Sequence, residues 1–176
     1  MSAVGSGDID GQQIGRGVYT IDPERSVISF QTRALFGVIR VRGTFGVEGG
    51  KITVADPVEE STAEATVSAV AFASGNAKRD EHVRSEDYLD ATRYPRFSFV
   101  SERFEWSGDH GTLRGQLTVK EAKQQVTLDV SQVSGDERSL TARATTTIDR
   151  FAFGVKTAPG MTGRNLHIVL DIIASR

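Results

Sequence analysis

The chain has 176 residues, of which 38% are hydrophobic and 25% charged, and its formal net charge at pH 7 is −2. This length suits one domain with its own core, and the composition indicates neither a membrane protein nor a disordered chain. Acidic and basic residues are interspersed, which predicts no strong attraction to nucleic acid or anionic lipid, and the absence of cysteine excludes disulfides, thiol catalysis and cysteine-bound metals.

Residues 1–16 are predicted to form a flexible tail, because small and polar residues dominate them, and residues 17–176 a single β-barrel domain. The start of the chain has no basic segment followed by an apolar run, so we expect no signal peptide and a cytoplasmic location. No stretch approaches the roughly 18 apolar residues that a membrane span needs, so we expect no membrane-spanning segment.

Short alternating segments begin after the tail. Strands are predicted over residues 18–21, 26–35, 41–47 and 51–55. Asp22-Pro23 and Gly37 mark the first turns, and Gly49-Gly50 predicts a hairpin turn before the fourth strand.

The next strand, over residues 62–72, is unusual because small residues occupy one of its faces. Ala63, Ala65, Val67, Ala69 and Ala71 alternate with larger or polar residues. Alanine has a poor strand propensity, so its repeated use suggests that this face fills little of the space that the sheet encloses.

A polar insert follows at residues 75–93. Nine of the sixteen residues from 75 to 90 are charged or histidine. We expect a short helix here, with Ser85 as the N-cap of a helical turn that runs through Leu89.

Alternating strands then resume and continue almost to the end of the chain, over residues 96–104, 113–120, 126–130, 140–148 and 166–172. A long meander with one apolar face is best served by closing on itself, because closure removes exposed sheet edges. The predicted fold is therefore an all-β, antiparallel up-and-down barrel of about eight strands, with a short helical insert near residues 75–93.

A barrel of this size can be filled by side chains or can hold a ligand. Small residues facing large apolar ones predict an apolar channel that suits an alkyl or isoprenoid chain. An alternative is that the alanines let the insert pack closely. The predicted lining consists of Phe30, Phe45, Ala65, Val67, Ala69, Phe97, Phe99, Leu117, Leu128, Ala142, Ala144 and Ile168.

The densest polar cluster lies in the insert and comprises Arg79, Asp80, His82 and Arg84. It predicts a polar mouth whose arginines bind a phosphate or carboxylate head group; the alternative is a loop held by its own salt bridges. Arg150 has the inward parity of its strand and is a second candidate for the mouth, or for a salt bridge at the rim.

Other chemistries have little support in the sequence. The three histidines, at positions 82, 110 and 167, are scattered and form no metal motif. No serine has the Gly-x-Ser-x-Gly context of a hydrolase, and no phosphate-binding loop occurs. We therefore expect no metal, no cofactor and no catalytic residue.

The ordered motifs resemble the YceI-like family from about residue 17 to residue 174. They are Tyr19-Thr20-Ile21-Asp22-Pro23-x-x-Ser26-x-Ile28-x-Phe30, Gly43-x-Phe45, Arg79-Asp80-x-His82-x-Arg84-Ser85-x-Asp87-Tyr88-Leu89-Asp90, Tyr94-Pro95-x-Phe97-x-Phe99, Gly115-x-Leu117-Thr118-Val119 and Arg150-x-x-Phe153-Gly154. The resemblance implies a lipocalin-like barrel that holds a polyisoprenoid, an isoprenoid quinone or a similar long-chain amphiphile, often as a homodimer, with links to lipid transport or storage and to stress responses. Here Lys120 to Gln125 replaces the family's usual Gly- and Pro-containing hairpin, so no contact is carried over to it.

Three functions follow as hypotheses. The first is non-catalytic binding, storage or transport of a long isoprenoid or acyl lipid. The second is a lipid-modifying enzyme that uses His82 with Asp80 or Asp87 as acid and base, and it requires the imidazole to face the cavity near a carboxylate. The third is a stress-related structural or partner-binding barrel whose interior is filled.

Overall fold

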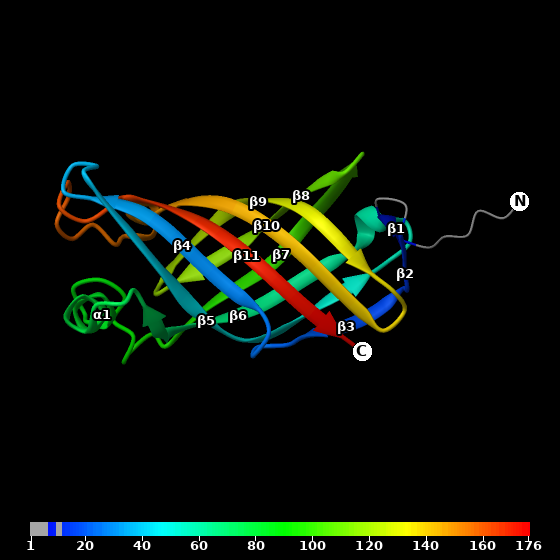
Figure 1. The fold of residues 1–176 in the computed structure, drawn as a ribbon, viewed down its shortest axis with the longest axis horizontal. Helices are drawn as coiled ribbons and strands as arrows, with labels where there is room; N and C mark the ends of the chain where they lie inside the picture. The colour runs from blue at the N-terminus through cyan, green and yellow to red at the C-terminus, as the bar shows by residue number, and fades with distance from the viewer. Residues whose placement is uncertain (1–6, 10–11) are drawn as a thin grey trace, which may run out of the picture.

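The structure, a computed structural model, describes residues 7–9 and 12–176 (Figure 1). Its strands are β1 (Gly7–Ile9), β2 (Gln12–Ile14), β3 (Gly17–Ile21), β4 (Val27–Ala34), β5 (Ile39–Val54), β6 (Thr62–Ala73), β7 (Arg96–Ser107), β8 (His110–Val119), β9 (Ala122–Gly135), β10 (Ser139–Asp149) and β11 (Asn165–Ser175). The helix α1 spans Ala77–Arg84, and the short 3₁₀ helices η1 and η2 span Val58–Glu60 and Arg150–Phe153.

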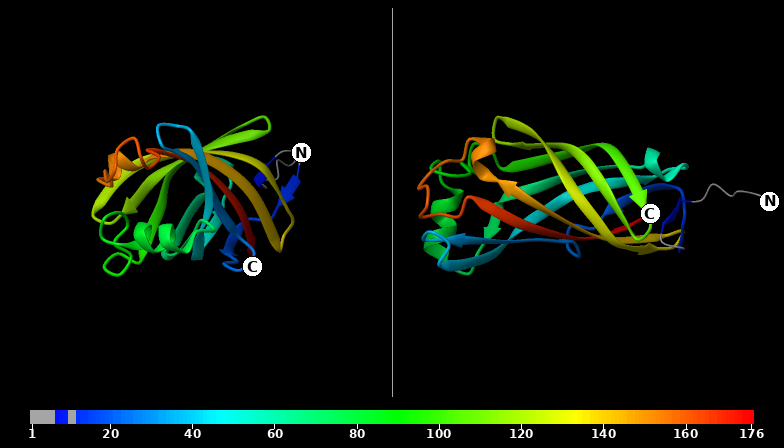
Figure 2. Two further views of the ribbon diagram at one scale, coloured as in Figure 1. Left: turned by 60° about the vertical axis from the view of Figure 1, so that its left-hand side comes forward. Right: turned by 90° about the horizontal axis from the view of Figure 1, so that it is seen from above.

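The strands close into a barrel. From β5 to β11 each strand pairs antiparallel with the next one in the chain. β3 and β4 share one position, because both lie between β11 and β5, at opposite ends. Within the described residues the ring therefore has eight positions, which confirms the predicted antiparallel barrel of about eight strands. Figure 2 shows the strands wrapping around the barrel, with α1 at one end.

The predicted hairpin at Gly49-Gly50 is wrong, because β5 runs through both glycines without a break. The first part of β5 pairs with β4 and the last part with β3. The glycines lie next to a register shift against β6, where Val47 faces Val67 and Gly49 faces Thr66. The glycines therefore mark a β-bulge that redirects a continuous strand instead of ending it.

The alternation predicted for β6 holds as far as Ala69 and then changes face. Between Ser68 and Ala73 the register against β5 shifts, and the Ser68 hydroxyl accepts a hydrogen bond from the Ala71 N–H at 3.2 Å. As a result Ala71 is exposed, whereas Phe72 is buried. A bulge thus places Phe72 on the inner face, where simple alternation put Ala71.

The insert contains the expected helix, but its boundaries differ from the prediction. The helix begins after Asn76, whose side chain accepts a hydrogen bond from the Arg79 N–H, and it ends at Arg84, before Ser85. Ser85 is therefore the C-cap and not the N-cap. Asn at position 76 is an equally good N-cap residue, which explains the error.

The predicted tail lies partly outside the described residues, at positions 1–6 and 10–11. In the described part, β1 pairs with β2. Ile14 is fully buried in the core, and the Gly15 N–H donates to the Asp136 carbonyl at 3.2 Å. The chain is thus attached to the barrel from Ile14 onward, and a flexible tail stays a prediction for the residues before it.

Candidate functional site

A cavity of about 690 Å³ occupies the half of the barrel next to α1. Its floor and walls include a cluster of four phenylalanines: Phe30 lies 5.4 Å from Phe45 and 5.3 Å from Phe72 between ring centroids, and Phe45 lies 5.7 Å from Phe97. We call this space the mouth cavity. A volume of this size contradicts the alternative of a filled interior for this half of the barrel.

The position of Phe30 depends on a glycine in the neighbouring strand. Phe30 faces Gly43 in the register of β4 and β5. A Cβ at position 43 would lie 2.6 Å from the Phe30 ring and 2.3 Å from the Ala73 carbonyl oxygen. Only glycine lets the ring lie flat over β5, and so the sequence Gly-x-Phe at 43–45 helps to shape the aromatic wall.

A second, smaller cavity of about 150 Å³ lies farther along the barrel, and we call it the inner cavity. Ala65, Ala142 and Ala144 line it opposite Phe99 and Leu128. Small residues thus face large apolar ones here, as the alternation of these strands predicts. The exposed surface of this cavity is entirely apolar, so it suits hydrocarbon and no polar group.

The two cavities are arranged in series, and a belt of apolar side chains separates them. On β7, Phe97 lines the mouth cavity and Phe99 the inner one. Val67, Leu117, Val126 and Ile168 lie at the intermediate level of their strands, line neither cavity and pack beside the mouth-side core. A chain that extends from the mouth cavity into the inner cavity has to pass this belt.

The predicted lining residues therefore fall into distinct groups. Eight of them line a cavity: Phe30, Phe45 and Phe97 the mouth cavity, and Ala65, Phe99, Leu128, Ala142 and Ala144 the inner one. Val67, Leu117 and Ile168 belong to the belt. Ala69 lines neither cavity, because it is fully buried in the cluster that also holds Tyr88, Leu89 and Ala91.

Of the predicted polar mouth, Arg79, His82 and Arg150 line the mouth cavity, whereas Asp80 and Arg84 do not. The Arg84 guanidinium donates through Nη2 to the Phe72 carbonyl, and so joins α1 to β6. Asp80 accepts hydrogen bonds from the Ser74 N–H at 2.9 and 3.1 Å and from its hydroxyl. These two residues fasten the helix instead of facing the cavity.

Asp80 is a buried carboxylate, with 7% of its surface exposed. Burial alone would raise its pKa, but the Ser74 hydrogen bonds and the charges of Arg84 and Arg79 outweigh burial, so that its pKa is lowered. The ionised form is therefore the one that the fold stabilises.

Arg150 is buried to a similar degree, and its guanidinium binds only backbone carbonyls. Nε donates to Gly163, Nη1 to Val155 and Nη2 to Thr157, each at 2.8 Å, and Nη2 also donates to Thr162 at 3.1 Å. Burial lowers the pKa of Arg150. Arg150 therefore forms no salt bridge with the described residues of the rim, and most of its donors are already used by the protein and not left for a ligand. It holds the loop from η2 to β11 around a positive charge beside the cavity.

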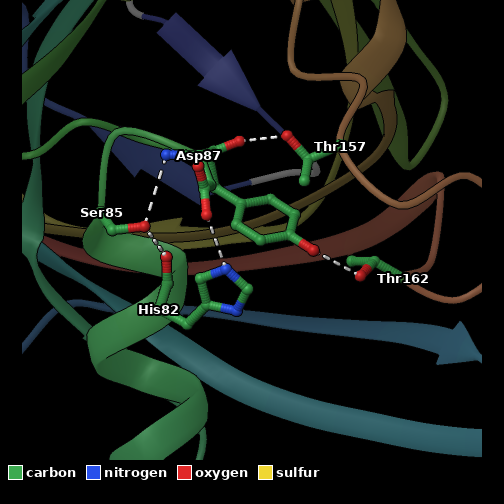
Figure 3. A network of polar contacts seen from close by, with 6 residues as sticks. His82, Ser85, Asp87, Thr157 and Thr162 are labelled. Atoms are coloured by element: carbon green, nitrogen blue, oxygen red, sulfur yellow. Dashed lines mark hydrogen bonds and ion pairs between the residues drawn. The ribbon is translucent and has the colours of Figure 1, made fainter.

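The histidine of the insert forms a pair with a carboxylate (Figure 3). His82 Nε2 lies 3.0 Å from Asp87 Oδ2, and the Ser85 hydroxyl donates to the His82 carbonyl. Two threonines of the loop before β11 hold the same segment: Thr157 donates to the Asp87 carbonyl, and Thr162 lies 2.7 Å from the Tyr88 hydroxyl. The residues after α1 are thus fastened to this loop across the cavity mouth.

The His82–Asp87 pair satisfies one requirement of the enzyme hypothesis, because the imidazole lines the cavity near a carboxylate. However, 57% of the His82 side chain and 59% of the Asp87 side chain are exposed. A pair in contact with bulk water gains little of the low-dielectric enhancement on which acid–base catalysis depends. Among the described residues, no group of three or more His, Asp or Glu could hold a metal ion.

Another pocket, of about 680 Å³, lies on the barrel wall where β9 and β10 separate. Their pairing ends at Thr145 opposite Asp129, and beyond it the Thr146 hydroxyl donates to the Thr127 carbonyl at 2.8 Å. Glutamine, threonine and aspartate side chains form much of its lining. Apolar side chains, among them Val126, Ile148 and Ile168, form the rest of it. Because this mixed lining lies on the barrel wall and not along its interior, we do not assign the pocket to the lipid site.

Several lining residues escaped prediction. Phe72 was placed on the outer face, and the bulge in β6 moves it inward. Tyr88, Leu89 and Phe153 also line the mouth cavity. They lie in the motifs after α1 and at η2. The sequence identified these motifs, but it did not indicate the direction in which their side chains point.

Comparisons with known proteins agree with this geometry. The model of the YceI-like domain matches residues 19–174. Protein YceI of Shigella flexneri is 26% identical over 88% of this chain and 84% of its own length. A UPF0312 protein of Pseudomonas putida strain GB-1 is 29% identical over 97% of this chain and 92% of its own length.

Solved structures show the same fold. BcnA of Burkholderia cenocepacia superposes with a TM-score of 0.76 at 23% identity and covers 88% of this chain and 99% of its own. A polyisoprenoid-binding domain from Saccharophagus degradans, described as implicated in plant cell wall breakdown, superposes with a TM-score of 0.66 at 11% identity and covers 89% of this chain and 97% of its own. In the part of the chain that the structure describes, no helix has the length and apolar character to cross a bilayer.

Proposed function

The chain belongs to the YceI-like family, and from this premise we propose that it binds a long-chain amphiphilic lipid of the polyisoprenoid class in its barrel, without changing it chemically. The observation that carries the proposal is the pair of apolar cavities in series, of about 690 and 150 Å³. Each CH₂ group that enters such a space from water contributes about 0.8 kcal/mol, so even a chain of moderate length gains substantial affinity.

The polar end of the ligand is proposed to lie at the mouth. Arg79, His82 and Arg150 line this cavity, and the hydrogen bonds of the Arg150 guanidinium all go to neutral carbonyl groups. Its positive charge is therefore not cancelled by a carboxylate in direct contact. A head group that is anionic or rich in acceptors, such as a phosphate, a carboxylate or a quinone, complements this charge.

Lipid modification is the alternative that a specific contact favours, namely His82 Nε2 at 3.0 Å from Asp87 Oδ2. We prefer non-catalytic binding because both side chains of the pair are more than half exposed. Beyond its polar mouth, the wall of this cavity consists largely of phenylalanine and other apolar side chains. Prolonged incubation with a bound polyprenyl phosphate should return the ligand with its mass unchanged. A product that disappears in His82→Gln but persists in the exposed control His110→Gln would establish the enzyme.

The direct test is native purification from the source organism, followed by mass spectrometry of the extracted lipids. We expect a polyisoprenoid or a related long-chain lipid in stoichiometric amount. Protein that carries nothing apolar, and that also takes up no polyprenyl phosphate or quinone in vitro, contradicts the proposal.

Replacing Arg79 by Ala tests the place of the head group. We expect about tenfold weaker binding of a polyprenyl phosphate, because a hydrogen bond to a charged group contributes about 1.5 kcal/mol or more, and little change for the neutral polyprenol. Arg114→Ala, on the outer face of β8, is the matched control. Since Arg79 also donates to Ser74 Oγ at 2.8 Å, equal losses for both lipids would indicate a structural role instead.

Finer aspects of the function stay predictions. These are storage or transport of the lipid, a link to stress, a cytoplasmic location and a homodimer. Sedimentation velocity over a range of concentrations checks the dimer, and fractionation of the source cells checks the location.

A further inference from the structure

The turn between β4 and β5 exposes an unusual amount of apolar surface. The exposed fraction is 82% for Phe36, 79% for Val38 and 45% for Ile39, and Leu35 and Met161 beside them are 37% and 51% exposed. We call these five residues the apolar tip. Single exposed apolar residues need no explanation, but a contiguous group at one end of a molecule marks an interaction surface.

The backbone holds the tip in place. Leu35 and Phe36 adopt φ angles of 48° and 54°, in the left-handed region that residues with a Cβ rarely adopt. Their N–H groups donate to the carbonyls of Met161 and Gly160 at 3.0 and 2.7 Å. A Cβ on Gly160 would lie 2.5 Å from the Phe36 ring, so the ring is seated against this glycine. The strained turn therefore presents Phe36 in a fixed place.

Positive charge lies beside the tip, on one exposed side of the β4–β5 hairpin. Arg33 faces Arg40 directly in the register of β4 and β5, and Arg42 follows on the same exposed side. Like charges in opposite positions destabilise a strand pair, so fold stability does not account for this arrangement. Residues 27–47 contain these three arginines and no acidic residue. Although the net charge of the chain is −2, the β4–β5 hairpin is locally basic.

The tip also borders the cavity mouth. Leu35, Ile39 and Met161 line the mouth cavity as well as forming part of the exposed surface. Figure 1 shows the β4–β5 turn, the loop before β11 and α1 together at the left-hand end of the barrel. A surface in contact with the tip therefore lies at the entrance of the cavity.

We propose that this end of the barrel docks on a bilayer that contains anionic phospholipids. Phe36 and Val38 enter the region of the acyl chains, and Arg33, Arg40 and Arg42 bind the phosphate groups around them. An apolar tip beside a row of arginines is complementary to an anionic lipid surface, because apolar side chains insert below the head groups while the arginines pair with the phosphates. If the lipid-binding function proposed above holds, docking lets cargo pass between bilayer and cavity without crossing water, but the docking itself requires no cargo.

The test is flotation of the purified protein with vesicles of phosphatidylcholine and phosphatidylglycerol, and with vesicles of phosphatidylcholine alone. We expect binding to the anionic vesicles that weakens at high salt. Phe36→Asn should reduce partitioning about tenfold or more, since a phenylalanine side chain leaves the apolar phase. Asparagine tolerates the left-handed backbone, so the turn should keep its shape. Val18→Asn, on β3 at the other end of the barrel, is the matched control and should bind normally.

Arg40→Gln tests the charge. It should reduce partitioning about fivefold, and it should leave thermal stability unchanged or higher, because it relieves the repulsion with Arg33. Arg138→Gln, in the turn between β9 and β10, removes the same charge elsewhere and should have no effect. Failure of the wild type to float, or equal flotation of all four variants, overturns the proposal. A dimer that Phe36→Asn abolishes, without any vesicle binding, would identify a second copy of the chain as the partner instead.

Docking and cargo binding can fail separately. Phe36→Asn should retain the lipid found by mass spectrometry, because its side chain does not line the cavity. Protein that floats but neither carries a lipid nor takes up polyprenyl phosphate or quinone in vitro would leave the docking proposal intact and contradict the proposed function.

Discussion

Alanine occupies two environments along β6, and the difference decides where a ligand can lie. Ala65 borders the inner cavity, whereas Ala69 is fully buried beside the segment that follows α1. The alanine pattern left two interpretations open, an apolar channel and close packing of the insert. Ala65 fits the first and Ala69 the second. The same small side chain leaves space at the inner cavity, and permits close packing where the segment after α1 lies over it.

A bulky ring at Ala65 should restrict the barrel to lipids with shorter chains. In Ala65→Phe the benzyl group fills most of an inner cavity of about 150 Å³ but leaves the mouth cavity open. We expect lipids with shorter chains in mass spectra of the purified variant, without loss of the fold. Ala71→Phe is the matched control, since Ala71 lies on the same strand and is exposed. An unchanged distribution of chain lengths would show that the inner cavity holds no ligand.

Removing one side chain from the belt should have the opposite effect. Leu117→Ala opens the level between the two cavities, so longer chains should be retained, at a cost of about 2–3 kcal/mol of unfolding free energy. Leu113→Ala, which enlarges only the inner cavity, is the control. If both variants bind the same lipids as the wild type, Leu117 does not limit the passage.

Arg150 shows how far a single residue can be interpreted before its neighbours are known. Its inward parity indicated a buried or rim charge, and it is buried. Its partners, however, are carbonyls of Val155, Thr157, Thr162 and Gly163. These residues belong to a loop whose sequence has no regular hydrophobic pattern. The sequence therefore does not indicate that their carbonyl groups surround a guanidinium.

The helix α1 is fastened to the barrel by charge as well as by its caps. Ser74, in the connection from β6, binds the Asp80 carboxylate and accepts a hydrogen bond from Arg79 Nε at 2.8 Å. Asp80 is the only buried residue of the helix, so apolar packing contributes little to its attachment. Its attachment therefore depends on hydrogen bonds to an ionised group, which depend on pH.

The depressed pKa of Asp80 gives this attachment a defined pH dependence. The folded pKa lies below the ordinary value of 3.8, so the stabilisation is fully present above that pH and is lost as pH falls through the lower, folded pKa. Asp80→Asn should cost about 2 kcal/mol of unfolding free energy at neutral pH, and less as the solution becomes more acidic. Urea titrations at several pH values measure this difference.

The comparison needs a control because Asp109, Asp136 and Asp149 also have lowered pKa values, through hydrogen bonds to His110, Arg138 and Arg164 respectively. Subtracting the variant from the wild type removes their contribution. The exposed Asp129→Asn should leave the stability profile unchanged. A cost for Asp80→Asn that stays constant down to low pH would show that the carboxylate acts through shape and not through charge.

The barrel as a whole contains two cores, one on each side of the belt. One cluster of buried residues includes Ile14, Tyr19 and Leu140, and the other includes Phe30, Phe72 and Tyr88. Each surrounds one of the two cavities. A protein with unfilled space forgoes the packing energy that a ligand can restore.

Extraction of the bound lipid should therefore destabilise the whole barrel. A ligand present at about 100 times its dissociation constant adds about 2.7 kcal/mol to the unfolding free energy, which corresponds to a fall in Tm of about 5–10 °C on its removal. Differential scanning calorimetry before and after detergent extraction measures this change. Re-addition of the extracted lipid should restore the Tm, and the same Tm in both states contradicts occupancy of the cavities.

Strand alternation and short turns were sufficient to predict an antiparallel barrel, because period-two patterning is a local property and closure follows from the need to cover edges. Eight of the twelve predicted lining residues border a cavity for the same reason. The bulges at Gly49 and after Ser68, the belt at Leu117 and the carbonyl partners of Arg150 became visible only in three dimensions. Each depends on which residue of a distant strand or loop lies opposite, and pairing between distant segments leaves no local trace in a single chain.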